Sequence, residues 1–166
     1  MRAEVRRIVP DDWPALRALR LEALADTPLA FLETLEAARA LGDEVWRARA
    51  ARGSVGGDAA QVVAAEDGSG RALATCLAFV SDERVWLGAV YVTPVARGHG
   101  LVAAMLEQVA AWARAQGQDA LLLEVHEDNG AARRAYERLG FVPTGARRPY
   151  PLDPTREELE MRLELG

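Results

Sequence analysis

The chain has 166 residues, of which 50% are hydrophobic and 27% are charged, a balance typical of a single globular domain, here residues 1–166. Its formal net charge of −5 argues against nucleic-acid binding, which favours a basic excess. No apolar run approaches the roughly 20 residues that span a membrane and no signal-peptide core follows Met1, so we expect a cytoplasmic protein.

The first third of the chain is predicted to hold one strand and two helical stretches. Residues 5–9 favour a strand that ends at Pro10. From Trp13 to Asp26 apolar residues recur at helical spacing. A second helical stretch is expected over residues 33–52, interrupted near Gly42, with a loop over residues 53–58.

Three closely spaced strands follow, over residues 61–66, 72–80 and 85–92, separated by turns that contain Gly and Asp. Gly88 inside the third strand indicates a bulge or the close approach of another backbone. The single cysteine, Cys76, excludes an internal disulfide and a Cys-rich zinc site. Because it lies in an apolar run, we expect a buried strand residue rather than a nucleophile.

The second half alternates helices and strands. We expect a helix over residues 98–116, an apolar strand over 120–125, and a short helix from Asn129 to Leu139. A strand begins at residues 141–144, and another runs over residues 158–165. The order β-α-α-β-β-β-α-β-α-β-β predicts a mixed α/β (α+β) domain with an antiparallel first half and a β-α-β unit behind it.

One turn has the properties of an anion site. The strand that ends at Val92 leads into Arg97-Gly98-His99-Gly100, which opens a helix. The first N–H groups of a helix lack partners and carry partial positive charge, and glycines let an anion approach them closely. A P-loop is excluded because no Gly-Lys-Ser/Thr follows, and a dinucleotide fingerprint because residue 103 is Ala. A plain strand-to-helix turn is the other interpretation of this segment alone.

Two motifs together resemble the GNAT superfamily of N-acetyltransferases. The first, Val92-x-Pro94-x-x-Arg97-Gly98-x-Gly100, is similar to the family's acetyl-CoA motif Gln/Arg-x-x-Gly-x-Gly/Ala, with Val102 in place of its last Gly or Ala. The second, running from Asn129 through Tyr136 to Gly140-Phe141, resembles Asn-x-x-Ala-x-x-x-Tyr-x-x-x-Gly-Phe at the same spacing. The resemblance implies a GNAT-like fold and acetyl-CoA as co-substrate.

The resemblance also implies a set of cofactor contacts. Strand main-chain groups would meet the pantetheine arm, the turn and helix start would hold the diphosphate, and residues of the second motif would complete the site. The expected cofactor-binding residues are Val90, Val92, Arg97, Gly98, His99, Gly100, Leu101, Val102, Asn129 and Arg133. Asn129 is alternatively a helix N-cap, and Arg133 a solvated helix arginine.

Tyr136 resembles the family's proton donor to the CoA sulfur, since a phenol keeps its proton at neutral pH; a packed helix tyrosine is the other interpretation. The general base is less well marked, because the strand before the turn carries no acid. The candidates are Glu83 at the strand's entrance and His126, whose ordinary pKa suits a base. Glu124 and a chain of water molecules are the alternatives. Each of these side chains could equally be structural.

On the acceptor side, the family resemblance implies that residues 24–31 form a wall of the site. Apolar surface there could come from Trp13, Phe31, Trp46, Trp86 and Tyr150, and an irregular loop over residues 150–154 could cover it. We expect acetyl transfer to a primary amine of a small molecule or peptide, with no metal. The alternatives are a non-catalytic acyl-CoA sensor or interaction domain and an enzyme for longer acyl chains; homodimers are common among similar proteins.

Overall fold

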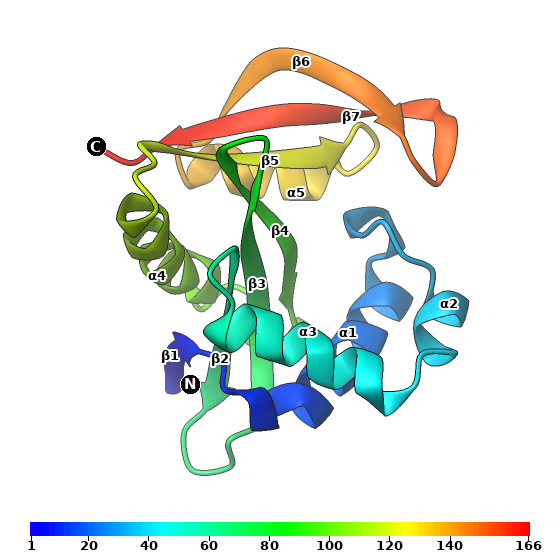
Figure 1. Ribbon diagram of the computed structural model, residues 1–166. Coiled ribbons are helices and arrows are strands. Elements are labelled where there is room, and N and C mark those ends of the chain that lie inside the picture. Colours follow the sequence, from blue (N-terminus) through cyan, green and yellow to red (C-terminus); the bar gives the residue numbers. More distant parts are fainter.

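A computed structural model describes residues 1–166 and contains one seven-stranded sheet in the order β1-β2-β3-β4-β5-β7-β6. Strands β4 and β5 pair in parallel, and every other neighbouring pair is antiparallel. Figure 1 shows the two parts of this sheet, β1 to β4 and β5 to β7, diverging from each other. The strands are β1 Ala3–Arg7, β2 Ala59–Glu66, β3 Ala72–Ser81, β4 Arg84–Val92, β5 Ala120–His126, β6 Val142–Tyr150 and β7 Asp153–Glu164. The predicted mixed α/β class is confirmed.

Helices cover both faces of the sheet. On one face, α1 (Trp13–Asp26), α2 (Leu35–Arg39) and α3 (Asp43–Val55) bury a cluster around Leu19 and Trp46. On the other, α4 (Leu101–Ala115) and α5 (Gly130–Arg138) pack on the main core, which contains Met105 and Phe141. Three short 3-10 helices complete the chain: η1 Pro10–Asp12, η2 Pro28–Ala30 and η3 Pro94–Ala96. None of the helices combines the length and the apolarity needed to cross a membrane.

The expected loop over residues 53–58 is partly wrong, because α3 continues to Val55. Gly53 is helical and buried, and a Cβ placed there would lie 2.7 Å from the Cβ of Gln61 on β2. The glycine therefore permits the close approach of α3 to the sheet rather than ending the helix.

The expected irregular loop over residues 150–154 is also wrong. Tyr150 ends β6, Asp153 begins β7, and only Pro151 and Leu152 separate the two strands. The prolines of this segment favoured a loop, but Pro151 lies in the turn, and Pro154 lies in the part of β7 before its pairing with β5 begins at Glu158. The resulting hairpin reaches across to the segment that follows α1 (Figure 1).

The bulge suggested by Gly88 is present in β4. Thr75 pairs with Tyr91, whereas Leu77 pairs with Gly88, so β4 holds one residue more than β3 between these pairs. Ala89 takes the left-handed conformation, with φ +51°. Only Trp86 and Leu122 pair between β4 and β5, so the two strands part beyond the bulge and leave an opening in the middle of the sheet.

Candidate active site

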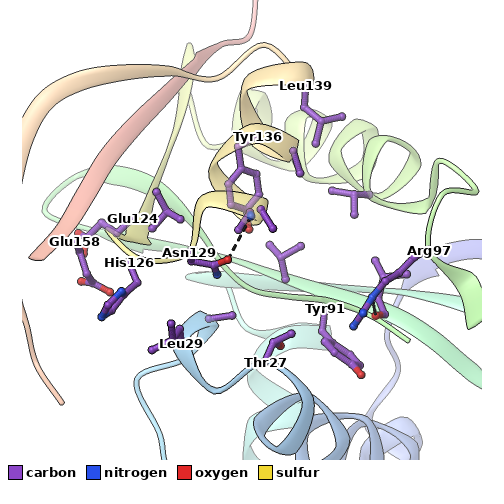
Figure 2. A pocket seen from close by; sticks show the side chains of 18 residues that line it. Thr27, Leu29, Tyr91, Arg97, Glu124, His126, Asn129, Tyr136, Leu139 and Glu158 are labelled. Atoms are coloured by element: carbon purple, nitrogen blue, oxygen red, sulfur yellow. Dashed lines mark hydrogen bonds between the residues drawn. The ribbon is translucent and has the colours of Figure 1, made fainter. Parts of the chain in front are cut away.

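A cavity of about 390 Å³ occupies the opening between β4 and β5. Its walls come from β4, β5, α5 and the segment after α1, and Figure 2 shows Tyr136 projecting into its middle. The carboxylates Glu124 and Glu158 lie at one end, and Arg97 lies at the other. Val90 and Val92, two of the expected cofactor residues, line it as well.

The glycine turn at the start of α4 presents a row of free backbone N–H groups. Gly98 and Gly100 have φ of +78° and +74°, a conformation that L side chains rarely adopt. No backbone or side-chain acceptor contacts the N–H groups of residues 98–103. The N–H groups of Leu101 and Val102 belong to this row, so the geometry expected of an anion-binding helix start is present.

The Arg97 side chain turns away from these N–H groups. Its guanidinium pairs with Asp26 at the end of α1, its Nε donates to the Val92 carbonyl at 3.1 Å, and it lies over the Tyr91 ring. Asp26 also accepts a hydrogen bond from the Tyr91 hydroxyl at 3.3 Å. Arg97 therefore links the start of the glycine turn to α1 rather than pointing its charge into the turn.

His99 stabilises the turn itself. Its Nδ1 lies 3.2 Å from the carbonyl of Ala96 and 3.0 Å from that of Arg97. Carbonyls only accept, so this nitrogen carries the proton and the ring folds back on its own loop. The His99 side chain therefore stabilises the turn by hydrogen bonding to the turn's own carbonyls, which sequence spacing did not indicate.

The two residues of the second motif lie together on the cavity wall. Asn129 Oδ1 accepts from the Ala132 N–H at 3.3 Å and so caps α5, which confirms the capping interpretation. Tyr136 projects from α5, its ring packs edge-on against Phe141 at 5.7 Å, and its hydroxyl has no protein partner. Burial raises the pKa of the Tyr136 hydroxyl above its ordinary range, so the group carries its proton at neutral pH.

His126 is buried at the end of β5 and lines the cavity. Its Nδ1 accepts the Asp128 N–H at 3.0 Å, and its ring packs edge-on against Tyr150 at 4.6 Å. An Nδ1 that accepts places the ring proton on Nε2. The nitrogen that could receive a proton is thus already occupied, which weighs against His126 as a base.

Of the expected site residues, Gly98, His99, Gly100 and Leu101 form the glycine turn next to the cavity, whereas Glu83 and Arg133 belong neither to the cavity nor to the turn. Glu83 takes a left-handed conformation, φ +61°, in the β3–β4 turn, and its carbonyl accepts from Gln118. Arg133 is half-exposed on α5 and pairs with Glu137 one turn along. Glu83 does not line the cavity that holds Tyr136, which weighs against it as a base, and Arg133 forms an exposed ion pair on α5.

A second cavity of about 270 Å³ adjoins the first on the α1 side of the sheet. Phe31 and Trp86 line it, as expected, whereas Trp13 and Trp46 pack among the helices instead. Tyr150 is buried and donates to the Phe31 carbonyl at 2.9 Å. This bond holds the β6–β7 hairpin against the predicted acceptor wall.

Sequence reasoning missed Glu158. This residue on β7 lies opposite His126 and, with Glu124, lines both cavities. Burial, followed by the Glu124 carboxylate beside it, raises the pKa of Glu158 to about 7. The only signal in the sequence was an acidic residue at the start of an alternating strand, and nothing there indicated which strand it would face.

Cys76 is buried in β3, as expected, and burial raises the pKa of its thiol to about 12. A thiol that stays protonated at neutral pH is a poor nucleophile. The structure therefore supports a packing role for this residue.

Comparison with known proteins shows that other solved structures share this fold. Solved structures that share the fold include a GNAT acetyltransferase from Streptococcus pneumoniae (TM-score 0.80, 20% identity, 99% of this chain and 100% of that one). The PaiA N-acetyltransferase of Thermoplasma acidophilum, in complex with coenzyme A, has a TM-score of 0.78 at 16% identity over 99% of each chain. A phosphinothricin acetyltransferase from Sinorhizobium meliloti, in complex with acetyl-CoA, has a TM-score of 0.77 at 20% identity over 100% of this chain and 90% of that one.

At these identities the likeness is one of fold, and no curated protein sequence matches the chain. A model of the acetyltransferase (GNAT) family matches residues 18–141, which hold both predicted motifs. The family expected from these motifs is confirmed: the chain belongs to the GNAT family of acetyltransferases.

Proposed function

We propose that this protein is an acetyl-CoA-dependent N-acetyltransferase, which moves an acetyl group to a primary amine of a small molecule or peptide by direct attack in a ternary complex. The observation that carries the proposal is the continuity of three features in one cavity. Arg97 and Val102 lie at one end, where the free N–H groups of the glycine turn begin, separated strands lie in the middle, and Tyr136 projects between them. Such a site suits a ligand that has an anionic end and an extended arm.

The fit to acetyl-CoA rests on groups that have no partner within the protein. The N–H groups of residues 98–103 are suited to a diphosphate, because they are unpaired and next to a helix start. Beyond Gly88 the edge of β4 is unpaired with β5, so it can accept an extended amide chain as an added strand. Val102 replaces the usual small residue, but only the N–H at that position is needed. When bound, acetyl-CoA supplies the activated thioester.

We assign Tyr136 the role of general acid. Its hydroxyl keeps its proton at neutral pH, it is free of protein partners, and the ring is held by Phe141. A leaving thiolate is a weak base that still gains from a nearby donor, and a placed acid contributes roughly 10² to 10⁴-fold to rate. Asn129 is the second motif residue at this wall; besides capping α5, it is our candidate for a hydrogen bond to the arm of the ligand.

Two measurements test the proposed function. Calorimetry should show binding of acetyl-CoA, and a thiol assay should show CoA release that depends on an added primary amine. Absence of acetyl-CoA binding would contradict the proposal. Tight binding without turnover across a wide amine panel would instead favour a non-catalytic acyl-CoA sensor. Competition among acyl-CoAs of increasing chain length tests the preference for acetyl.

A further inference from the structure

The two cavities meet at a pair of carboxyl groups. Only Ala30, Glu124 and Glu158 line both the cavity that holds Tyr136 and the one walled by Phe31 and Trp86. The register of β5 with β7 places Glu124 and Glu158 on the same face of the sheet, since His126 is opposite Glu158. The pair therefore lies where an acceptor entering from one side would reach a thioester held on the other.

The carboxyl group of Glu158 is incompletely satisfied by the protein. Its side chain is 8% exposed, and its buried Oε2 atom accepts no hydrogen bond, although the Arg148 Nε lies 3.5 Å away as an ion-pair partner. A buried polar atom without a partner costs free energy, and a ligand that donates a hydrogen bond would recover part of this cost. This oxygen belongs to a side chain that lines the cavity junction.

A cation from the protein already lies beside the pair. Arg148 of β6 places its Nη2 2.5 Å from Glu124 and its Nε 3.5 Å from Glu158 Oε2, while its side chain is 57% exposed. Because most of the Arg148 side chain is exposed, it can swing into solvent when another cation takes its place beside the two carboxylates. The two glutamates are thus a site for a positive charge, occupied here by a side chain that can leave it.

The other residues that line the second cavity indicate the chemical character of the rest of the acceptor molecule. Phe31, Leu32, Phe79 and Trp86 give it an apolar lining. The other cation on this wall, Arg20, is committed: it donates to Glu33 at 3.0 Å and stacks on Phe31 at 4.5 Å. Apart from Arg148, which the incoming ammonium would displace toward solvent, no uncommitted positive charge lines this cavity to receive a carboxylate on the acceptor.

We propose that Glu124 and Glu158 form the subsite for the acceptor amine, and that Glu158 accepts a proton from its ammonium group. The acceptor is then a primary amine with an apolar body and no carboxylate. This inference rests on the proposed acetyl transfer. The ammonium displaces Arg148 and gives one proton to Glu158. The neutral nitrogen then bonds to the acetyl carbon while the carbon–sulfur bond breaks. Tyr136 gives its proton to the sulfur and regains one from the new amide nitrogen, and the Glu158 proton leaves to solvent.

Catalysis through Glu158 implies a characteristic pH profile. The base must be ionised, so kcat/KM should rise with pH through the Glu158 pKa of about 7. This titration takes place among charged and titratable neighbours from the elements around the carboxyl. They are Glu124 and His126 on β5, Arg147, Arg148 and Tyr150 on β6, Glu160 on β7, Arg84 on β4, Arg20 on α1, and Asp82 in the β3–β4 turn.

The substitution Glu158→Gln tests the carboxyl directly, because it keeps the shape and removes the charge. We expect kcat/KM for 2-phenylethylamine to fall about 100-fold, the rise near pH 7 to disappear, and the acetyl-CoA Kd to stay within about twofold of the wild type. The matched control is Glu160→Gln, two residues along the same face, where the carboxylate bonds Thr144 and lines neither of the two joined cavities. Equal activity of the two variants, with acetyl-CoA binding intact, would overturn the assignment.

The acceptor class is tested with the wild-type enzyme. We expect 2-phenylethylamine and 3-methylbutylamine to exceed L-phenylalanine and L-leucine at least tenfold in kcat/KM, and Arg148→Gln to lower the KM for the two amines. A preference for the amino acids, turnover confined to peptides, or a tenfold higher KM in the Arg148 variant would overturn the subsite. Failure of the wild type to bind acetyl-CoA, or to acetylate any amine, would contradict the proposed function itself. That result differs from the outcomes that would overturn only the subsite.

Discussion

Replacing Tyr136 with Phe removes one oxygen from the middle of the cavity. The hydroxyl has no protein hydrogen bond, so its loss leaves no buried group unsatisfied, and the ring contact with Phe141 at 5.7 Å is retained. We therefore expect the free energy of unfolding to change by less than about 1 kcal/mol. Acetyl-CoA affinity should also stay within about twofold, because the free N–H groups of residues 98–103, the proposed diphosphate site, are unchanged.

Turnover should respond very differently. Loss of a general acid costs roughly 10² to 10⁴-fold in rate, which is about 2.7 to 5.5 kcal/mol of activation free energy. The assay is CoA release at saturating acetyl-CoA and amine, with calorimetry and thermal unfolding on the same preparation. If kcat for Tyr136→Phe equals that of the wild type while both controls are normal, Tyr136 is a packing residue and the thiolate takes its proton from water.

Three other substitutions test the fold around the site. Gly100→Ala places a Cβ at a residue with φ +74°, so we expect about 1–2 kcal/mol of destabilisation and at least tenfold weaker acetyl-CoA binding. The neutral control is Gly57→Ala, at an open site with ordinary φ. Equal acetyl-CoA affinities of the two variants would refute the N–H site. Tyr150→Phe leaves the Phe31 carbonyl without its donor and should cost about 1–3 kcal/mol in urea unfolding; an unchanged midpoint would mean that the hairpin does not depend on this bond. Because folding raises the pKa of Glu158 from its ordinary value of 4.5 to about 7, its stabilising contribution is full below pH 4.5 and is lost as pH rises through 7. Glu158→Gln should therefore gain Tm relative to the wild type above pH 7 and not below 4.5, and a difference that does not vary with pH would contradict this linkage.

The parts of the site that could be predicted are those encoded within one short segment. Gly98 and Gly100 are required by two left-handed backbone positions at the start of α4, and Asn129 caps the helix that begins beside it. Each of these depends on neighbours within a few residues, so sequence spacing carries the information. The bulge at Gly88 is of the same kind, because a glycine in a strand is itself the signal.

The parts that could not be predicted depend on partners far along the chain. Arg97 was expected to bind the cofactor, yet its guanidinium pairs with Asp26, 71 residues away in the sequence. His126 was considered as a base, yet it lies buried opposite Glu158 of β7, with its ring packed against Tyr150 of β6. The orientation of a long or buried side chain follows from what packs around it, and motif spacing carries no information about that.

The amino-acid sequence by itself determined the order of the elements, the glycine turn at the start of α4, and the family, because periodicity, turn residues and two motifs are local properties of the chain. Only the tertiary structure decided how those elements serve a reaction. It parted β4 from β5 beyond the bulge, and it paired β5 with β7 in the register that brings Glu158 beside Glu124. The physical reason is that register and burial come from packing between distant segments, and a shift of one residue in β7 would turn Glu158 to the opposite face.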